Sequence, residues 1–235
     1  METSALIHEW FYPEGPDTFE YLLPVESFSP DHGKTIPEWI QGYASLTPAE
    51  ASKRFVEYLD SIALAEVVAF TRVVKTLAPF SITVHEADTW LLCKRRDQFD
   101  ERSAHGNMLQ LHGPHDNFGW PSFFDSDRFN PLKHFLKYFG AARIDIPPTC
   151  GILSPVNIQP VYEELETHAW KNIQNWTGSY PVYNVGNGDV VLVNSNCEFG
   201  IWCHGLCDDP NGAVQSLGSF VEFIEFATNN IGIAK

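Results

Sequence analysis

Apolar residues recur at helical spacing in two neighbouring segments before residue 80. Residues 47–50, Thr-Pro-Ala-Glu, combine a capping residue, a proline for the first turn and a glutamate that can bind the cap amide. They predict a helix over about 48–59. A second helix is expected over about 61–78, ended by Pro79. Because its apolar positions cover most of its circumference, we expect this second helix to be largely buried.

Three further helices are indicated in the second half of the chain. From residue 130, apolar side chains follow helical spacing up to Gly140, a residue typical of a helix end. The segment Val161–Asn172 favours another helix. The last helix has the clearest start, because residues 219–222, Ser-Phe-Val-Glu, form a capping box ahead of an apolar stripe.

Runs rich in β-branched and aromatic residues predict a set of short strands. Gly186-Asn187-Gly188 is typical of the tight turn of a hairpin, between strands at about 181–185 and 189–194. The other expected strands cover about residues 19–23, 80–85, 89–93 and 199–203. Together with the helices they predict an α+β fold, in which helices pack against an antiparallel sheet.

The run Val190–Val193 is apolar at every position, which is typical of a central strand covered on both faces. We expect one face to contact the last helix through Phe220, Phe223 and Ile224. We expect the other face to contact an element of the N-terminal half, and we favour the helix at 61–78. Under this hypothesis the two halves of the chain form one cooperative unit.

The polar stretch between the two organised regions carries no sustained period. Residues 94–127 are punctuated by Gly and Pro, so we expect a long loop or a domain boundary there. We therefore divide the chain into two parts. Residues 1–125 are expected to form a helical and irregular region packed on the core, and residues 126–235 an α+β region.

Composition limits the class of protein further. The chain carries 30 Asp and Glu against 15 Lys and Arg, a net charge of −15. Such a charge disfavours binding to nucleic acid or anionic lipid, so we expect neither nucleic acid nor membrane as a partner. No apolar run reaches the ~20 residues of a membrane span, and the first residues lack the features of a signal peptide. We expect a cytoplasmic protein with free cysteine thiols.

Short motifs in the second half resemble a known family. A Gly-Asp pair, Gly188 and Asp189, opens a strand, and Trp202 lies in a strand that ends near His204. The last helix follows the pattern Ser-Phe-x-Glu-Phe. In their order over residues 130–235 these motifs resemble the SMI1/KNR4 (SUKH) superfamily. The matching positions in the last helix are Ser219, Phe220, Glu222 and Phe223.

The resemblance implies a SUKH-like fold and a non-catalytic protein that needs no cofactor. Many bacterial members of that superfamily are thought to be immunity proteins that bind and neutralise a toxin, often a nuclease, and others are regulatory scaffolds. Residues 146–235 hold nine acidic residues and two lysines, and an acidic surface attracts a basic toxin. The acidic residues expected to contact such a partner are Glu163, Glu164, Glu198, Asp208 and Asp209.

Two other groups of residues leave metal chemistry open. His112 and His115, followed by a carboxylate, could serve a metal-dependent enzyme. The segment from Cys197 to Cys207 holds three cysteines and His204, ligand types that Zn²⁺ prefers, but it lacks a Cys-x-x-Cys pair. We favour ordinary roles for both groups and expect no metal. A regulatory scaffold that binds an endogenous protein is a third hypothesis for the function.

Overall fold

The computed structural model shows an α+β fold, as the pattern predicts. Helices pack on an antiparallel sheet. The residues that the structure describes are 18–25, 37–85, 88–95, 108–113, 120–140, 142–144, 150–152, 176, 178–185, 189–203 and 214–230.

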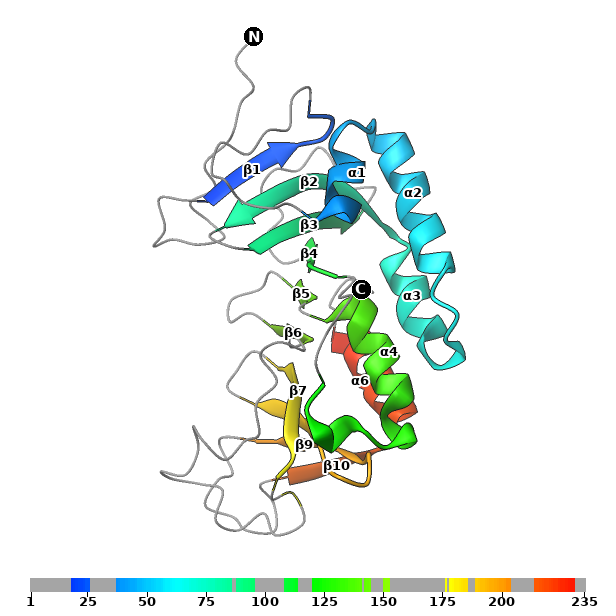
Figure 1. Ribbon diagram of the computed structural model, residues 1–235, viewed down its shortest axis with the longest axis vertical. Coiled ribbons are helices and arrows are strands. Elements are labelled where there is room, and N and C mark those ends of the chain that lie inside the picture. The colour runs from blue at the N-terminus through cyan, green and yellow to red at the C-terminus, as the bar shows by residue number, and fades with distance from the viewer. Residues whose placement is uncertain are drawn as a thin grey trace.

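The described strands form one antiparallel sheet, in which every strand pairs only with its neighbours in chain order. They are β1 (Thr18–Leu22), β2 (Leu77–His85), β3 (Asp88–Arg95), β4 (Met108–Leu111), β5 (Arg143–Ile144), β6 (Cys150–Ile152), β7 (Tyr180–Asn184), β8 (Val190–Val193), β9 (Phe199–Trp202) and β10 (Val214–Gly218). The strands follow one another along the long axis of the molecule (Figure 1). The sheet therefore stays open, with β1 at one edge and β10 at the other.

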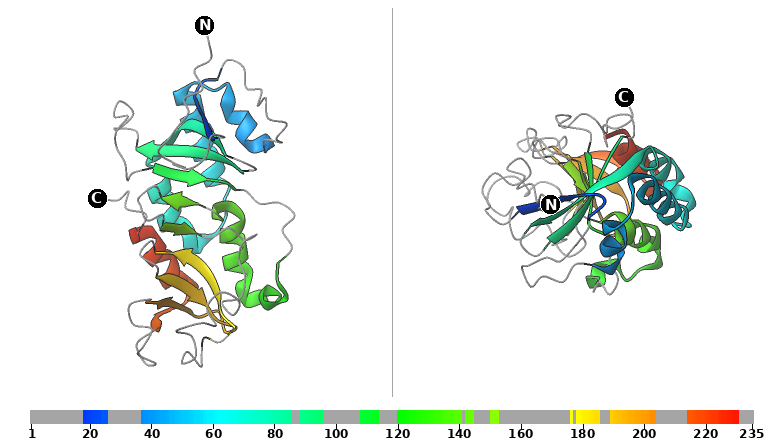
Figure 2. Two further views of the ribbon diagram at one scale, coloured as in Figure 1. Left: turned by 90° about the vertical axis from the view of Figure 1, so that its left-hand side faces the viewer. Right: turned by 90° about the horizontal axis from the view of Figure 1, so that it is seen from above.

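The helices lie on one side of this sheet, as two further views agree (Figure 2). The α-helices are α1 (Glu38–Ala44), α2 (Pro48–Asp60), α3 (Val68–Val74), α4 (Asn130–Phe139) and α6 (Phe220–Asn230). Short 3₁₀ turns are η1 (Ala65–Val67), η3 (Ser122–Phe124) and η4 (Asp127–Phe129). The start of α2 is the predicted capping box, because Glu50 accepts from the Thr47 amide at 2.9 Å and Thr47 accepts in return from the Glu50 amide.

Most local predictions are confirmed. The helix at 48–59, the helix from residue 130 and the last helix correspond to α2, α4 and α6. The strands expected from local composition correspond to β1, β2, β3 and β9, and the hairpin is formed by β7 and β8. The helix expected over 161–172 lies outside the described residues.

The predicted helix at 61–78 is wrong in its extent. The chain forms only η1 and α3 there, and strand β2 already begins at Leu77. Pro79 therefore lies within a strand and does not end a helix. A proline is tolerated at this position for two reasons: β1 pairs only with Ser81–His85, and the β2–β3 register shifts between Pro79 and Ser81.

The prediction of one long loop over 94–127 is also wrong in part. Residues 108–111 form β4, which pairs with β3 on one side and β5 on the other. Leu109 and Leu111 are buried in the core, while Gln110 between them is buried too. The strand is only four residues long, which is too short to show a sustained period in the sequence. The sheet thus continues across the proposed boundary at residue 126.

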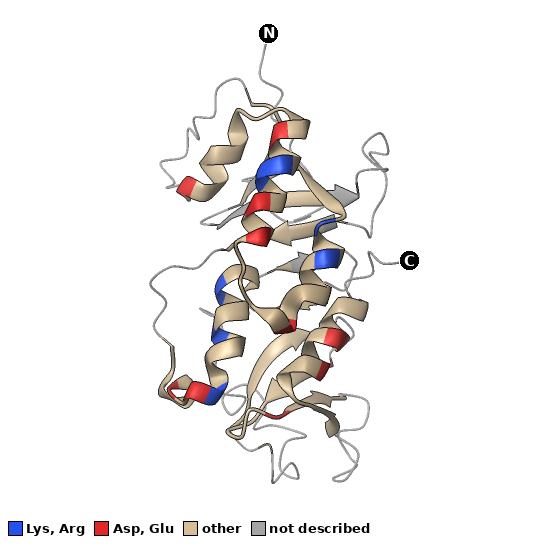
Figure 3. Ribbon diagram, turned by 90° about the vertical axis from the view of Figure 1, so that its right-hand side faces the viewer, with Lys and Arg blue, Asp and Glu red and all other residues tan. Residues whose placement is uncertain are grey.

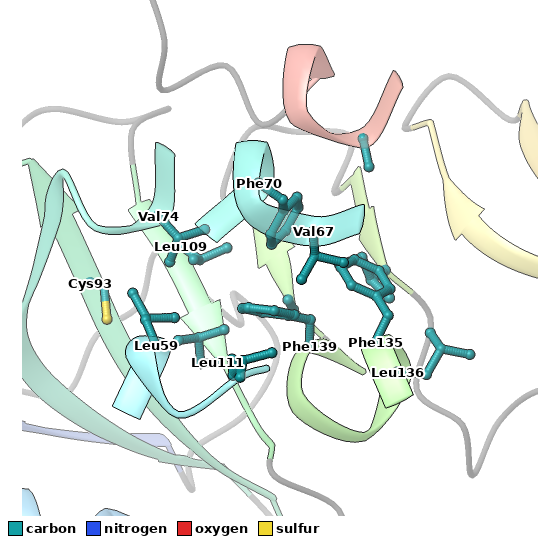
Figure 4. Packing of buried hydrophobic residues seen from close by; sticks show 14 of the residues in the cluster. Leu59, Val67, Phe70, Val74, Cys93, Leu109, Leu111, Phe135, Leu136 and Phe139 are labelled. Carbon is teal, nitrogen blue, oxygen red and sulfur yellow. The ribbon is translucent and has the colours of Figure 1, made fainter. Parts of the chain in front are cut away.

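The core between the sheet and the helices draws on both halves of the chain. Phe70 of α3 lies 5.2 Å from the Phe135 ring and 4.8 Å from the Phe139 ring, both on α4. Phe135 in turn contacts the rings of Phe220 and Phe223 on α6. Figure 4 shows Phe70 above Phe135 and Phe139, with the β4 leucines beside them. One continuous cluster of buried apolar residues follows from this packing.

Strand β8 is an interior strand, as expected, because it pairs with β7 and β9. Val191 and Val193 face the core and Leu192 is buried outside that cluster, so both faces are covered. The prediction that α3 covers the second face is wrong, because α3 packs against α6 on the helical side. Leu192 is paired with Gly200, and a Cβ at Gly200 would lie 2.7 Å from the Trp176 ring. Trp176 therefore covers the second face.

Candidate binding surface

The structure describes only some of the residues singled out in the sequence. Glu198 and Glu222 are exposed, and Asp189 is half-buried between β7 and β8. Trp202, Phe220 and Phe223 are buried and belong to the packing of the sheet and α6. The residues that lie outside the described part are Glu163, Glu164, Gly188, Asp208, Asp209, His115, His204 and Cys207.

The turn between β8 and β9 is organised by the side chain of Asn194. Its carbonyl oxygen accepts from the amides of Asn196 and Glu198, at 2.9 and 3.0 Å. Its amide group donates to the Glu198 carboxylate at 2.8 Å. These bonds satisfy the turn's own backbone donors. They also fix the Glu198 side chain at the surface.

Arg128 attaches this turn to the segment that precedes α4. Its guanidinium donates to the Ser195 carbonyl oxygen at 3.3 Å. The Cys197 thiol donates to the Arg128 carbonyl oxygen, also at 3.3 Å. Burial raises the pKa of the Cys197 thiol, and the nearby Arg128 charge opposes this only in part. Cys197 thus holds its proton at neutral pH and acts as a hydrogen-bond donor rather than a nucleophile.

Helix α6 begins at the same end of the sheet. Both the amide and the hydroxyl of Ser219 donate to the Glu222 carboxylate. These hydrogen bonds lower the pKa of Glu222. Gly218, just before the cap, has φ of +100°, and a Cβ there would lie 2.6 Å from that carboxylate. Glycine is required at this position because only glycine adopts such a φ without strain.

The register of the last two strands brings these acidic groups to one end of the molecule. Phe199 is the partner of Gly218, so Glu198 and Ser219 extend from adjacent strand ends. Arg128 holds η4 against the β8–β9 turn, which adds the exposed carboxylates before α4. Figure 3 shows acidic positions on η4 and on α6 in the same half of the molecule, on opposite sides of it. We call this surface the acidic rim, and it comprises Asp125, Asp127, Glu198 and Glu222.

Exposed valines adjoin the acidic groups of α6. Val221 is 46% exposed and precedes Glu222; Glu225 lies one helical turn further on. Val68 on α3 is 50% exposed, and α3 packs against α6. Among the described residues these two are the exposed large hydrophobic side chains. Neither valine was predicted as exposed from the sequence, although Val221 is an apolar residue on the polar side of the expected helix.

The charges of the chain are distributed unevenly along the sequence. Residues 172–234 include six acidic residues and no Lys or Arg. By contrast, α4 carries Lys133 and Lys137 and no acidic residue (Figure 3). The charged side chains of the C-terminal strands and α6 are therefore all negative.

Neither metal hypothesis gains support from the described residues. No group of three His, Cys, Asp or Glu side chains in this part of the chain is placed to hold a metal ion. His112 is half-buried just after β4, and its proposed partner His115 is not described. Cys203 lies near Asp189, whose charge adds to burial in raising the pKa of the thiol. Cys93, Cys197 and Cys203 are free thiols.

Comparisons of the chain with protein-family models, curated proteins and solved structures gave no match. The likeness to the SMI1/KNR4 superfamily therefore stays a prediction from motifs. Within the described residues, no helix is long and apolar enough to cross a membrane.

Proposed function

We propose that the protein is a non-enzymatic binding module for a basic protein, an immunity-type neutraliser of a toxin such as a nuclease. The observation that carries this proposal is that residues 172–234 contain acidic residues but no Lys or Arg. In the described part of this region, Glu198, Glu222 and Glu225 are all exposed. The SUKH-like motifs are compatible with the same function.

The physical properties of the surface suit such a partner. A field of one sign accelerates the approach of an oppositely charged protein and raises its association rate. Exposed apolar groups beside the charges also favour binding, because their surface is removed from water in the complex. Val68 and Val221 lie on packed helices and so offer such groups without a large change of structure.

The proposal predicts that a toxin gene lies beside the gene of this protein, and the test uses the toxin which that gene encodes. We expect the purified chain to bind that toxin and to protect cells that express it. Glu225→Lys reverses one charge on α6 without touching the Ser219 cap, so it should lower the association rate by about tenfold at low salt. Glu57→Lys is the matched control, because Glu57 is an exposed residue of α2 in the other half. It should change the rate less than about twofold.

The outcomes separate the hypotheses. Failure of the chain to bind or protect would remove the toxin-neutralising function. Equal effects of the two substitutions would remove the role of the C-terminal acidic surface. Binding without protection would favour the regulatory scaffold over the immunity function.

A further inference from the structure

Strand β10 forms an open edge of the sheet. It pairs with β9 on one side, and among the described residues no strand pairs with its other side. Gln215 and Ser216 in its middle are exposed. In an antiparallel pair the backbone groups of alternate residues point away from the partner strand. Within the described part of the chain, the N–H and C=O groups on the outer edge of β10 therefore have no strand to pair with.

This edge lacks two of the features that commonly keep sheet edges from pairing, namely charged residues and proline. The strand Val214–Gly218 contains no charged residue and no proline. Its register shift falls between Ser216 and Gly218, so residues 214–216 pair regularly with β9. The Val214 side chain lies over Gly200, which holds this end of β10 against the sheet. Among the described residues the edge is thus ordered, and its outer side is not paired with a strand.

Charge decides what kind of strand can pair there. Helix α6 follows β10 directly and carries Glu222 and Glu225, and two aspartates precede the strand at positions 208 and 209. A second copy of the chain would bring an equally acidic region to the same edge, and like charges in such positions repel. A segment rich in Lys or Arg would instead be attracted by the carboxylates of α6, which packs against β10.

We propose that β10 accepts an extended, Lys- or Arg-rich segment of the partner as an additional antiparallel strand. This inference rests on the proposed function and specifies how the partner is held. Backbone hydrogen bonds along β10 supply the affinity of such strand addition, and side chains near the added strand supply the selectivity. The exposed glutamates of α6, which packs against β10, select for a basic segment.

The test uses the full chain and a synthetic peptide of about eight alternating Val and Lys residues. The control is the same peptide methylated at every backbone nitrogen, which keeps all charges and removes all N–H donors. In an NMR titration of isotope-labelled protein, we expect the unmodified peptide to bind at least about tenfold more tightly than the control. We also expect its largest shifts at the amides of residues 214–218.

Three other results would each contradict the pairing of a basic segment with β10. Equal affinities would show that charge alone attracts the peptide, which leaves the proposed function standing. Absence of binding by both peptides would overturn this inference, while the toxin experiment tests the function separately. Self-association of the chain through β10 in sedimentation would identify a second copy as the occupant instead.

Two single substitutions give an independent check. The two variants are Gln215→Pro and Ser216→Pro, and each removes one backbone N–H of β10. Because the amides of successive strand residues point to opposite sides, one variant loses an N–H that points toward β9 and the other loses an N–H on the outer edge. Thermal unfolding identifies the variant that keeps the melting temperature. That variant should lose the affinity for the unmodified peptide. Retained affinity would contradict the proposal.

Discussion

Single carboxylates fix the starts of two helices. Glu50 accepts from Thr47 and Glu222 accepts from Ser219, and in each case these hydrogen bonds lower the pKa of the glutamate. Both contacts span only three residues, so the sequence alone could predict them. Local chemistry of this kind does not depend on the rest of the fold.

The Ser219–Glu222 contact predicts how stability depends on pH. A carboxyl whose pKa is lowered in the folded state stabilises that state above its ordinary value of 4.5, and the contribution is lost as the pH falls through the lowered pKa. We therefore expect Glu222→Ala to lower the melting temperature at pH 7. The difference from the parent should shrink as the pH falls below 4.5. Thermal unfolding between pH 7 and pH 3 measures it.

Glu225→Ala is the matched control, since Glu225 lies on the same helix and carries no cap contact. It should leave the melting temperature nearly unchanged over the same range. A pH-independent loss in Glu222→Ala would contradict the role of the carboxylate as a cap.

At the scale of elements, α6 is held by aromatic packing on the sheet. Phe223 is fully buried and stacks on Phe199 of β9, with ring centroids 4.8 Å apart. Removing a side chain of this kind costs the lost burial and leaves a cavity. We expect Phe223→Ala to reduce the free energy of unfolding by about 3–5 kcal/mol in a urea titration.

Phe226 gives the comparison on the same helix, because it is only partly buried and contacts Tyr183 at 5.8 Å. Phe226→Ala should cost clearly less than Phe223→Ala. Equal costs would show that α6 is not anchored through its inner face.

The elements that sequence analysis predicted correctly are those with a strong local signal. Helix α2 has a capping box, and the β7–β8 hairpin has a Gly-Asn-Gly turn. The wrong end of the helix at 61–78 depended on Pro79, which this strand tolerates because β1 does not pair there and because the β2–β3 register shifts. That register is a tertiary property. Strand β4 likewise exists because β3 and β5 flank it.

The candidate site also depends on tertiary contacts that local sequence does not predict. Its acidic residues are visible in the sequence, but the grouping of Glu198 with Glu222 depends on the pairing of β9 with β10. The addition of η4 depends on Arg128, which reaches Ser195 across 67 residues of sequence. No local pattern reports contacts of this length. The exposed edge of β10 follows only from the order of the strands.

At the scale of the whole molecule, one sheet and one core connect the two halves. Strand β4 pairs with β5 across residue 126, and Phe70 packs against α4 while α3 packs against α6. The acidic rim and β10 are built on the C-terminal part of this sheet. The proposed binding surface thus depends on a core to which the N-terminal half contributes.

The most direct test is the isolated fragment 126–235. Without α3 and β4, the fragment exposes the faces of α4 and α6 that Phe70, Leu109 and Leu111 cover in the full chain. We expect it to be insoluble or molten, with poorly dispersed amide signals in an NMR spectrum, whereas the full chain gives a dispersed one. A well-dispersed spectrum from the fragment alone would show that the halves fold independently and would contradict the single shared core.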